Sequence, residues 1–222
     1  MGFTNAPGIS FCWVGDDPIF LDLARDRYLA LSRDAGQALR RITDGVAAAE
    51  GDDGHVGRLV DRDLLVETSG DDVPHACRSL PEATRSLIDA DAAGAVTRRW
   101  SALADVMTAR TSLAIFGLAR TLERVRRRKR AVPTSTTVDD EGLGTQLARS
   151  FRDADATLGS LDLCVPRSVA MALRAARLGY RCDLVIGVKL RPFAAHCWVQ
   201  RDHLLVNEQT DVARQFIPIL VI

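Results

Sequence analysis

One proline fixes where a helix of this chain must begin. Pro166 has no backbone N–H group and its ring clashes with a preceding helical turn, so an α-helix accepts it only in the first turn. The residues after it recur at helical spacing and end in a glycine: Val169, Ala172, Leu173, Ala176 and Gly179. The sequence therefore predicts a helix that starts just before Pro166 and stops before Gly179.

This helix would carry Cys164 at its N-terminus. Free backbone N–H groups and the positive end of the helix dipole stabilise a thiolate there, which is the environment that a nucleophilic sulfur needs. A cysteine that is simply buried where a helix begins is a common alternative. The helix position alone leaves Cys164 open as either a nucleophile or a packing residue.

The residues that follow this helix alternate with the two-residue period of β-strands. Three strands are predicted, at residues 182–188, 195–200 and 204–207. In the second of them His196 and Trp198 point to one face and Cys197 points to the other. Because Cys164 belongs to a different element and can face His196, we predict Cys164 as the nucleophile and His196 as its base, and we reject Cys197.

A third group, carboxylate or amide, is needed to orient His196 and to stabilise its charged form. A two-residue loop at 202–203 puts Asn207 on the face of His196, whereas a three-residue loop at 201–203 puts Glu208 opposite His196. We favour the longer loop and therefore Glu208, with Asn207 as the second choice. Two further acidic residues are weaker candidates for the same role: Asp202 and Asp211.

The first eighty residues have a different pattern. Three short alternating segments, at 9–14, 19–23 and 28–31, predict an antiparallel meander. A helix capped by Asp34 is expected next, with apolar residues at helical spacing: Ala38, Leu39, Ile42 and Val46.

A second short helix is predicted at 55–61, with Val56, Leu59 and Val60 turned inward, and residues 64–67 form a last strand or helical turn. Together with the meander, these elements predict a winged-helix-like module. One strand edge of this module would be exposed beside a helix.

The middle of the chain is predicted to be helical. Apolar residues at mostly helical intervals indicate a long helix or a helix pair at 95–128, and we interpret their stripe as core: Trp100, Leu103, Val106, Met107, Leu113, Phe116, Leu118 and Leu122. We interpret the basic run at 124–130 as the solvated end of this helix rather than as a site for phosphate or an acidic peptide. A polar loop at 133–142 and a helix at 145–156 follow.

Residues 21–31, Leu-Asp-Leu-Ala-Arg-Asp-Arg-Tyr-Leu-Ala-Leu, resemble the second and third strands of the PqqD-like peptide-recognition domain. Members of that family bind the leader segment of a ribosomally made precursor peptide by adding it as a strand beside a helix. The resemblance implies peptide-binding residues on the third strand and on the neighbouring helix: Arg27, Tyr28, Leu29, Ala30, Leu31, Val56 and Leu59.

The C-terminal order of helix-start cysteine, strand histidine and following acid resembles the transglutaminase-like branch of papain-type cysteine peptidases. The lasso-peptide biosynthesis B proteins are more similar still, over about 60 residues. The matching stretches are Cys164 with Arg167 and Ser168, residues 184–188 (Leu-Val-Ile-Gly-Val), residues 192–199 (Pro-Phe-Ala-Ala-His-Cys-Trp-Val), and Asn207 with Glu208. This sequence departs from the family pattern at three positions: Cys197 where a small residue is usual, His203 where glycine is usual, and Glu208 where aspartate is usual.

Taken together, the two resemblances imply an α+β protein with a winged-helix-like peptide-recognition domain at 1–80 and a papain/transglutaminase-like cysteine peptidase at 81–222. The peptidase would have a helical part at 95–160 and a catalytic core at 160–222. The implied triad is Cys164, His196 and Glu208, which would remove the leader from a lasso precursor after a threonine in the leader's second-last position.

The resemblance also implies a partner. An asparagine-synthetase-like, ATP-dependent lasso cyclase would use the freed N-terminal amine of the core, and some family members work only together with that cyclase and ATP. This sequence has no P-loop pattern, so we expect no cofactor to bind it directly.

Composition excludes several other classes. The 29 Lys and Arg residues balance 29 Asp and Glu residues, which argues against nucleic-acid and membrane-surface binding. The five cysteines form no Cys-X-X-Cys pair and no cluster with zinc-ligand spacing, so we expect no metal site. Because neither a secretory signal nor an apolar run of about 18 residues is present, we expect a cytoplasmic protein.

Two alternatives come from other functional classes. A winged-helix module also permits DNA binding, but segment 55–61 contains only one Arg and one Asp and makes a poor recognition helix. The chain could instead be a leader-binding adaptor whose protease half is inactive and which delivers the precursor to the cyclase. Rapid thiol alkylation near neutral pH distinguishes an active cysteine from such an adaptor.

Overall fold

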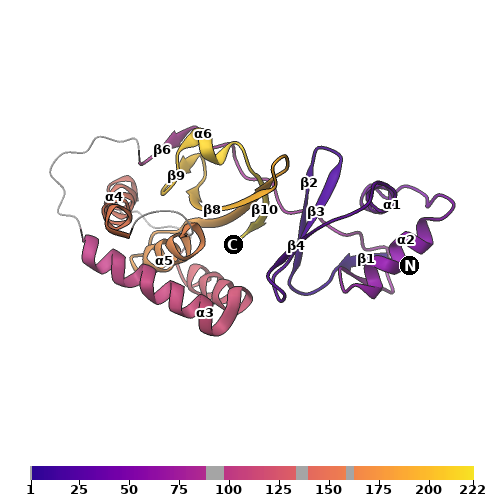
Figure 1. Cartoon of the computed structure of the whole chain (residues 1–222), viewed down its shortest axis with the longest axis horizontal. Coiled ribbons are helices and arrows are strands. Elements are labelled where there is room, and N and C mark those ends of the chain that lie inside the picture. The colour runs from indigo at the N-terminus through magenta and orange to yellow at the C-terminus, as the bar shows by residue number, and fades with distance from the viewer. Residues whose placement is uncertain (1, 89–97, 134–139, 159–162) are drawn as a thin grey trace. The chain divides into compact units, whose positions relative to one another are not determined.

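The computed structural model describes residues 2–88, 98–133, 140–158 and 163–222 (Figure 1). Its chain divides into two compact units, one of residues 1–78 with 217–220 and one of residues 79–216 with 221–222. Parts of three predicted segments lie outside the described residues: 95–97 of the long helix, 134–139 of the polar loop, and 159–162 before Cys164.

The predicted meander is confirmed in the first unit. Strands β2 (Ile9–Val14), β3 (Asp17–Asp22) and β4 (Arg27–Ala30) pair antiparallel in that order, so β4 is an edge of this sheet. Phe11 of β2 is paired with Phe20 of β3, and their rings stack 5.0 Å apart. Full burial of two such rings contributes roughly 1.5–3 kcal/mol each to stability.

Helix α1 (Arg33–Thr43) follows the meander, with two differences from the prediction. Ser32 caps it by accepting a hydrogen bond from the Ala35 N–H at 3.4 Å, whereas Asp34 lies within the first turn. The helix ends before Val46, whose side chain is 57% exposed, so the expected inward position of Val46 is wrong.

Helix α2 (Asp52–Asp61) begins three residues earlier than predicted. The buried Asp52 carboxylate accepts two hydrogen bonds from Arg41 of α1, at 2.6 and 2.5 Å. These bonds from Arg41 lower the pKa of Asp52 to about 2. A charge-assisted pair of this kind joins the two helices of the unit.

A second, two-stranded sheet in the first unit was not predicted. Strand β1 (Gly2–Asn5) pairs antiparallel with β5 (Leu65–Thr68), the latter being the predicted last strand. The core of the unit consists of buried apolar residues drawn from the sheets and helices: Phe11, Phe20, Leu39, Leu59, Leu64 and Leu65.

The five-stranded sheet contains the strands that follow the predicted catalytic helix. Its order is β10 (Ile217–Val221), β7 (Asp183–Lys189), β8 (Ala194–Arg201), β9 (Leu204–Leu205) and β6 (Arg85–Ser86). The β7–β8 and β8–β9 pairs are antiparallel, and β6 is parallel to β9.

The β8–β9 turn corrects one prediction. Arg201 pairs with Leu204 and Gln200 pairs with Leu205, so the loop has two residues and the favoured three-residue loop is wrong. Asp202 takes the positive backbone angle of this turn, with φ of 51°. The ladder between β8 and β9 then ends at Leu205, which is two residues shorter than the predicted strand.

The described residues of the second unit also form four helices: α3 (Arg99–Arg130), α4 (Asp140–Leu158), α5 (Cys164–Arg177) and α6 (Thr210–Ala213). Figure 1 shows α3 as two helical segments that meet at a bend, which falls at Gly117 with φ of 74° and ψ of 175°. Helix α5 packs against both α3 and β8, so the long helix supports the element that carries Cys164.

Helix α3 is long and apolar enough to cross a membrane by length and composition, and among the described residues it alone meets that test. Its break at Gly117 and its packing on α5 lead us to describe it as a pair of amphipathic helices. Five of the eight residues of the predicted stripe are buried or half-buried as expected, but Trp100 and Phe116 are 65% and 52% exposed. Met107 is also exposed, so the core interpretation is wrong for these three side chains.

The basic run at 124–130 forms the last turns of α3, and most of its side chains are exposed, which confirms the interpretation as a solvated helix end. Arg126 and Lys129 are half-buried, and Lys129 pairs with Asp183 at the start of β7. Cations in this position also favour the negative end of the helix dipole.

Candidate active site

Cys164 is the first residue of α5, as the position of Pro166 predicted. The preceding Leu163 offers no side-chain cap, and Pro166 has no N–H to contribute. The N–H groups of Cys164 and Val165 therefore lie at an uncapped helix start, next to the sulfur. Local chain chemistry alone places the thiol at the positive end of a helix dipole.

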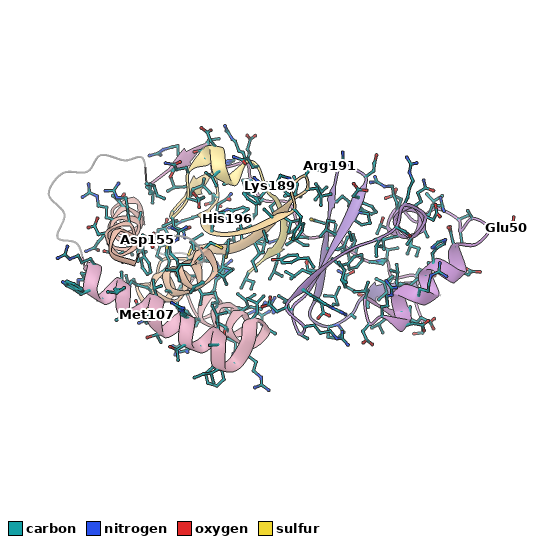
Figure 2. All side chains as sticks on the ribbon, viewed as in Figure 1. Glu50, Met107, Asp155, Lys189, Arg191 and His196 are labelled. Atoms are coloured by element: carbon teal, nitrogen blue, oxygen red, sulfur yellow. The ribbon has the colours of Figure 1, made fainter. Side chains whose placement is uncertain are left out.

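His196 is the third residue of β8, and Figure 2 labels it. Its pairing partner on β7 is Gly187, and a methyl group there would come within 2.7 Å of the Trp198 ring and 2.9 Å of Phe216. The His196 ring lies 5.3 Å from the Phe216 ring and 6.3 Å from the Trp198 ring, measured between centroids. Gly187 thus leaves room for an aromatic wall that supports the imidazole on one side.

The thiol of Cys164 and the imidazole of His196 are hydrogen-bonded to each other. Burial raises the pKa of Cys164, but the bond to His196, the charge of His196 and the backbone N–H of Cys197 together bring it below its ordinary value. Burial likewise lowers the pKa of His196, yet its bonds to Cys164 and Glu208 raise it to about 9. The pair is thereby biased toward a thiolate beside an imidazolium.

Glu208 completes the constellation, since its Oε2 lies 2.5 Å from Nε2 of His196. Burial raises the pKa of Glu208, but the bond to His196 and the N–H of Gln209 more than offset this and lower it. Glu208 is therefore a carboxylate, so Nε2 of His196 is the donor. That leaves Nδ1 of His196 for the sulfur of Cys164.

The structure brings Glu208 to His196 by a route different from the one predicted. The observed two-residue turn is the one that had assigned Asn207, not Glu208, to the face of His196. After Val206 N–H bonds to the Val199 carbonyl at 2.9 Å, the Val199 N–H bonds instead to Oδ1 of Asn207 at 2.7 Å. The side chain of Asn207 thus continues the ladder, and the chain turns so that Glu208 faces the imidazole.

A buried hydroxyl group connects these elements. Ser168, one helical turn after Cys164, donates from Oγ to the carbonyl of Cys197 at 2.9 Å and accepts from Nδ2 of Asn207 at 3.0 Å. Sequence analysis matched Ser168 only as part of a family motif. Its spacing of four residues from Cys164 was the signal that could have placed both on one helix face.

Arg167 also contacts the site. Its guanidinium donates to Asp155 of α4 at 2.9 Å, and another of its nitrogens lies 3.6 Å from Oε2 of Glu208 (Figure 2 labels Asp155). The positive charge of Arg167 adds to the lowering of the pKa values of Cys164 and Glu208. Its spacing of three residues from Cys164 places it over the same turn.

The remaining candidates lie apart from these contacts. Asp202 is in the β8–β9 turn and Asp211 is in α6, and the described contacts of His196 include neither. Burial raises the pKa of Cys197, which suits its rejection as a nucleophile. Within the described ranges, from 2–88 to 163–222, no group of three or more His, Cys, Asp or Glu side chains is placed to hold a metal ion.

The predicted peptide-binding residues belong to the first unit, where a pocket of about 180 Å³ lies beside the edge strand β4. It is lined by residues from the end of β4 and from α1 and α2: Ala30, Leu31, Ser32, Ala35, His55, Arg58, Leu59 and Arg62. Three of the seven predicted residues are therefore among its lining. Arg27, Tyr28 and Leu29 lie on β4 itself, and Val56 is buried in α2.

A thiol at a helix start, an imidazole on a strand and a carboxylate that orients it define a site of the cysteine-nucleophile type. Comparison with family models agrees with this class, since residues 103–221 match the transglutaminase-like superfamily. That match covers more than half of the 222 residues, and the chain belongs to this superfamily. Neither the curated proteins nor the solved structures include a match to the chain.

Proposed function

We propose that this chain is the leader peptidase of lasso peptide maturation, a cysteine peptidase that binds a precursor by its leader and cuts the bond between leader and core. The observation that carries the proposal is the position of His196, which is hydrogen-bonded to the thiol of Cys164 and, at 2.5 Å, to the carboxylate of Glu208. Such a set supplies nucleophile, base and orienting group without a cofactor.

The proposed reaction begins with proton transfer from Cys164 to Nδ1 of His196. The thiolate attacks the carbonyl carbon of the last leader residue, a C–S bond forms, and the carbonyl oxygen takes the negative charge. Nδ1 then gives its proton to the nitrogen of the core residue as the C–N bond breaks, which releases the core with a free amine. Water, deprotonated by His196, hydrolyses the thioester, and the leader leaves as a carboxylate.

The helix start of α5 suits the oxyanion of this reaction. The N–H groups of Cys164 and Val165 precede Pro166, and the N-cap residue Leu163 offers them no side-chain cap. We assign the N–H of Cys164 as an oxyanion donor, because a backbone donor at a helix N-terminus is fixed before charge develops.

The first unit is proposed to hold the leader by strand addition. Strand β4 is an edge of its sheet, which is the position where an extended peptide would add as a further strand. The adjacent pocket offers an apolar surface at Leu31 and Leu59, with Arg58 and Arg62 at its rim. Tethering the leader here would raise the local concentration of the scissile bond to roughly the millimolar range.

The proposed setting follows from the same activity. The freed core amine is the substrate of an asparagine-synthetase-like lasso cyclase, which we propose as the partner together with the precursor peptide. We place the reaction in the cytoplasm, where ATP for the cyclase is present and where thiols stay reduced.

A cleavage assay with a synthetic lasso precursor tests the proposal. Mass spectrometry of the products, with and without the cyclase and ATP, should show free leader and free core with the wild-type chain. Cys164→Ala should bind fluorescent leader normally and release no core. The matched control is Cys77→Ala, which removes another partly exposed thiol and should cleave at the wild-type rate.

Two results would contradict the proposal. Cleavage by Cys164→Ala at the wild-type rate would show that the nucleophile is wrong. A wild-type chain that binds leader but releases no core under any of these conditions would instead support the leader-binding adaptor with an inactive protease half.

A further inference from the structure

Helix α5 holds the backbone of a single β8 residue at two points. The N–H of Cys197 donates to the sulfur of Cys164, and the carbonyl of Cys197 accepts from Oγ of Ser168 at 2.9 Å. Cys164 and Ser168 lie four residues apart and therefore face the same side of α5. Because His196 directly precedes Cys197, these two bonds fix the position of the imidazole relative to the thiol.

Ser168 is in turn fixed by Asn207. Oγ of Ser168 accepts from Nδ2 of Asn207 at 3.0 Å, and Oδ1 of Asn207 accepts from the N–H of Val199 at 2.7 Å. A flipped amide would set Nδ2 against the N–H of Val199, donor against donor, so one orientation fits. Both side chains are almost fully enclosed, with exposed fractions of 0% for Ser168 and 4% for Asn207.

Asn207 also restrains the Glu208 carboxylate, because Glu208 is the next residue along the chain. The backbone carbonyl of Glu208 accepts a hydrogen bond from Oγ of Ser86 at 2.7 Å, and its Oε1 accepts from the N–H of Gln209 at 2.9 Å. The peptide that carries Glu208 is therefore held on both sides, by Asn207 and by Ser86.

We propose that Ser168 and Asn207 are positioning residues, which form one hydrogen-bond relay that holds Cys164, His196 and Glu208 in reactive register. The proposal rests on the proposed function only in taking Cys164 as the nucleophile. Neither residue contacts the reacting atoms; both act on the backbone that carries them. Loss of either side chain leaves buried partners unpaired and frees β8 to shift against α5.

A shift of this kind lowers reactivity before it unfolds the protein. A misplacement of about 1 Å between reacting groups costs about 100-fold in rate. We expect Ser168→Ala and Asn207→Ala each to lower the alkylation rate of Cys164 near pH 6.5 by about 10- to 100-fold. The KM for precursor should stay unchanged, since the relay residues belong to the second unit and the proposed leader site belongs to the first.

The test is a double-mutant cycle on the rate of Cys164 alkylation by iodoacetamide, resolved by peptide mass spectrometry, with melting temperature, kcat and KM measured on the same proteins. If both residues serve one relay, the double variant should react no more than about threefold slower than the slower single variant. The matched control is Ser150→Ala, which removes a buried hydroxyl of α4 that donates to the Gln146 carbonyl at 2.8 Å. It should keep the wild-type alkylation rate.

Two outcomes would overturn the relay. Ser168→Ala could lower the melting temperature as Ser150→Ala does and leave Cys164 alkylation unchanged, which would show a merely structural role. The two rate losses could instead multiply in the double variant, which would show two independent effects. Should Ser168→Ala fail to fold, Asn207→Ala alone carries the same comparison of rate against melting temperature.

Alkylation of Cys164 needs no precursor, so the test of the relay is independent of the cleavage assay that tests the proposed function. If the cycle shows coupling while the wild-type chain cleaves no lasso precursor, the relay stands and the leader-peptidase function fails. If the chain cleaves precursor and the relay variants keep full alkylation and kcat, the peptidase stands and the relay fails.

Discussion

Nε2 of His196 lies 2.5 Å from Oε2 of Glu208, although the register of β8 and β9 does not place the two residues opposite each other. The ladder of β8 and β9 stops at Leu205, and Asn207 uses its side chain to bond the next N–H of β8. The carboxylate therefore reaches the imidazole from a turn rather than from a strand. Its placement depends on side-chain hydrogen bonds, and these can be changed one at a time.

The pH profile of peptide cleavage should be bell-shaped. Activity requires a thiolate at Cys164 and a proton on His196 for the leaving amine. It should rise through the lowered pKa of Cys164, below the ordinary thiol value, and fall near pH 9 as His196 loses its proton. The measurement is kcat/KM from pH 4 to 10, and its two limbs belong to the coupled pair. Activity that keeps rising past pH 10 would contradict the assignment.

Glu208→Gln should move the alkaline limb of that profile. The Glu208 carboxylate raises the pKa of His196, so its loss should shift the fall in activity to lower pH by about one unit. Loss of the orienting charge should also reduce kcat by roughly 100-fold. Glu82→Gln is the control, because Glu82 is an exposed acid of the same unit that pairs with Arg214 at 3.1 Å. An unshifted limb in Glu208→Gln would show that this carboxylate does not act on His196.

Gly187→Ala should damage the site by way of its aromatic wall. The added methyl group would lie 2.7 Å from the Trp198 ring and force that ring or the strand to move, at a cost of about 1–3 kcal/mol in unfolding free energy. Chemical denaturation measures this cost, and the alkylation rate of Cys164 should fall with it because His196 packs on that wall. The control is Gly57→Ala in α2, where an added methyl group would meet nothing within 4 Å beyond its own stretch of helix, and where alanine favours the helix. Equal stability of the two variants would contradict the packing argument.

Leu31→Asp should weaken leader binding without touching the chemistry. Leu31 lines the pocket beside β4, and a carboxylate there would remove apolar surface from the proposed docking site. We expect the dissociation constant for fluorescent leader to rise by about tenfold or more. Alkylation of Cys164 should stay unchanged. Val46→Asp, an exposed position of the same unit, serves as the control. Unchanged leader affinity in Leu31→Asp would place the docking site elsewhere.

Those parts of the site that depend on local chain chemistry were predictable. Pro166 and Gly179 fix the ends of α5 through backbone constraints that act within a few residues, so Cys164 could be placed at a helix start. The alternation in β8 correctly separated His196 from Cys197, because a strand turns successive side chains to opposite faces.

Contacts between distant segments could not be predicted in this way. Ser86 bonds the backbone of Glu208 across 122 residues, and β1 pairs with β5 across most of the first unit. Periodicity cannot say which neighbour covers a face, which is why Trp100 and Phe116 were expected in the core and are exposed.

Glu208 does contact His196, but the argument that selected it was wrong. Its selection assumed a three-residue turn and an unbroken ladder, and the structure has neither. The side-chain amide of Asn207 decides the position of Glu208, because it takes the N–H of Val199 in place of a backbone carbonyl. Strand register takes no account of such a competition between side chain and backbone.

The most direct test of the central claim is the pH titration of Cys164 reactivity in the wild-type chain and in His196→Ala. Iodoacetamide modification, resolved for Cys164 and for Cys77 as the internal reference, gives the thiolate fraction at each pH. We expect wild-type Cys164 to titrate below 9.0. In His196→Ala only the Cys197 N–H and the Arg167 charge still oppose burial, so the titration should move to higher pH. Titration of wild-type Cys164 at or above 9.0, or an unchanged titration in His196→Ala, would contradict the pairing of this thiol with this imidazole.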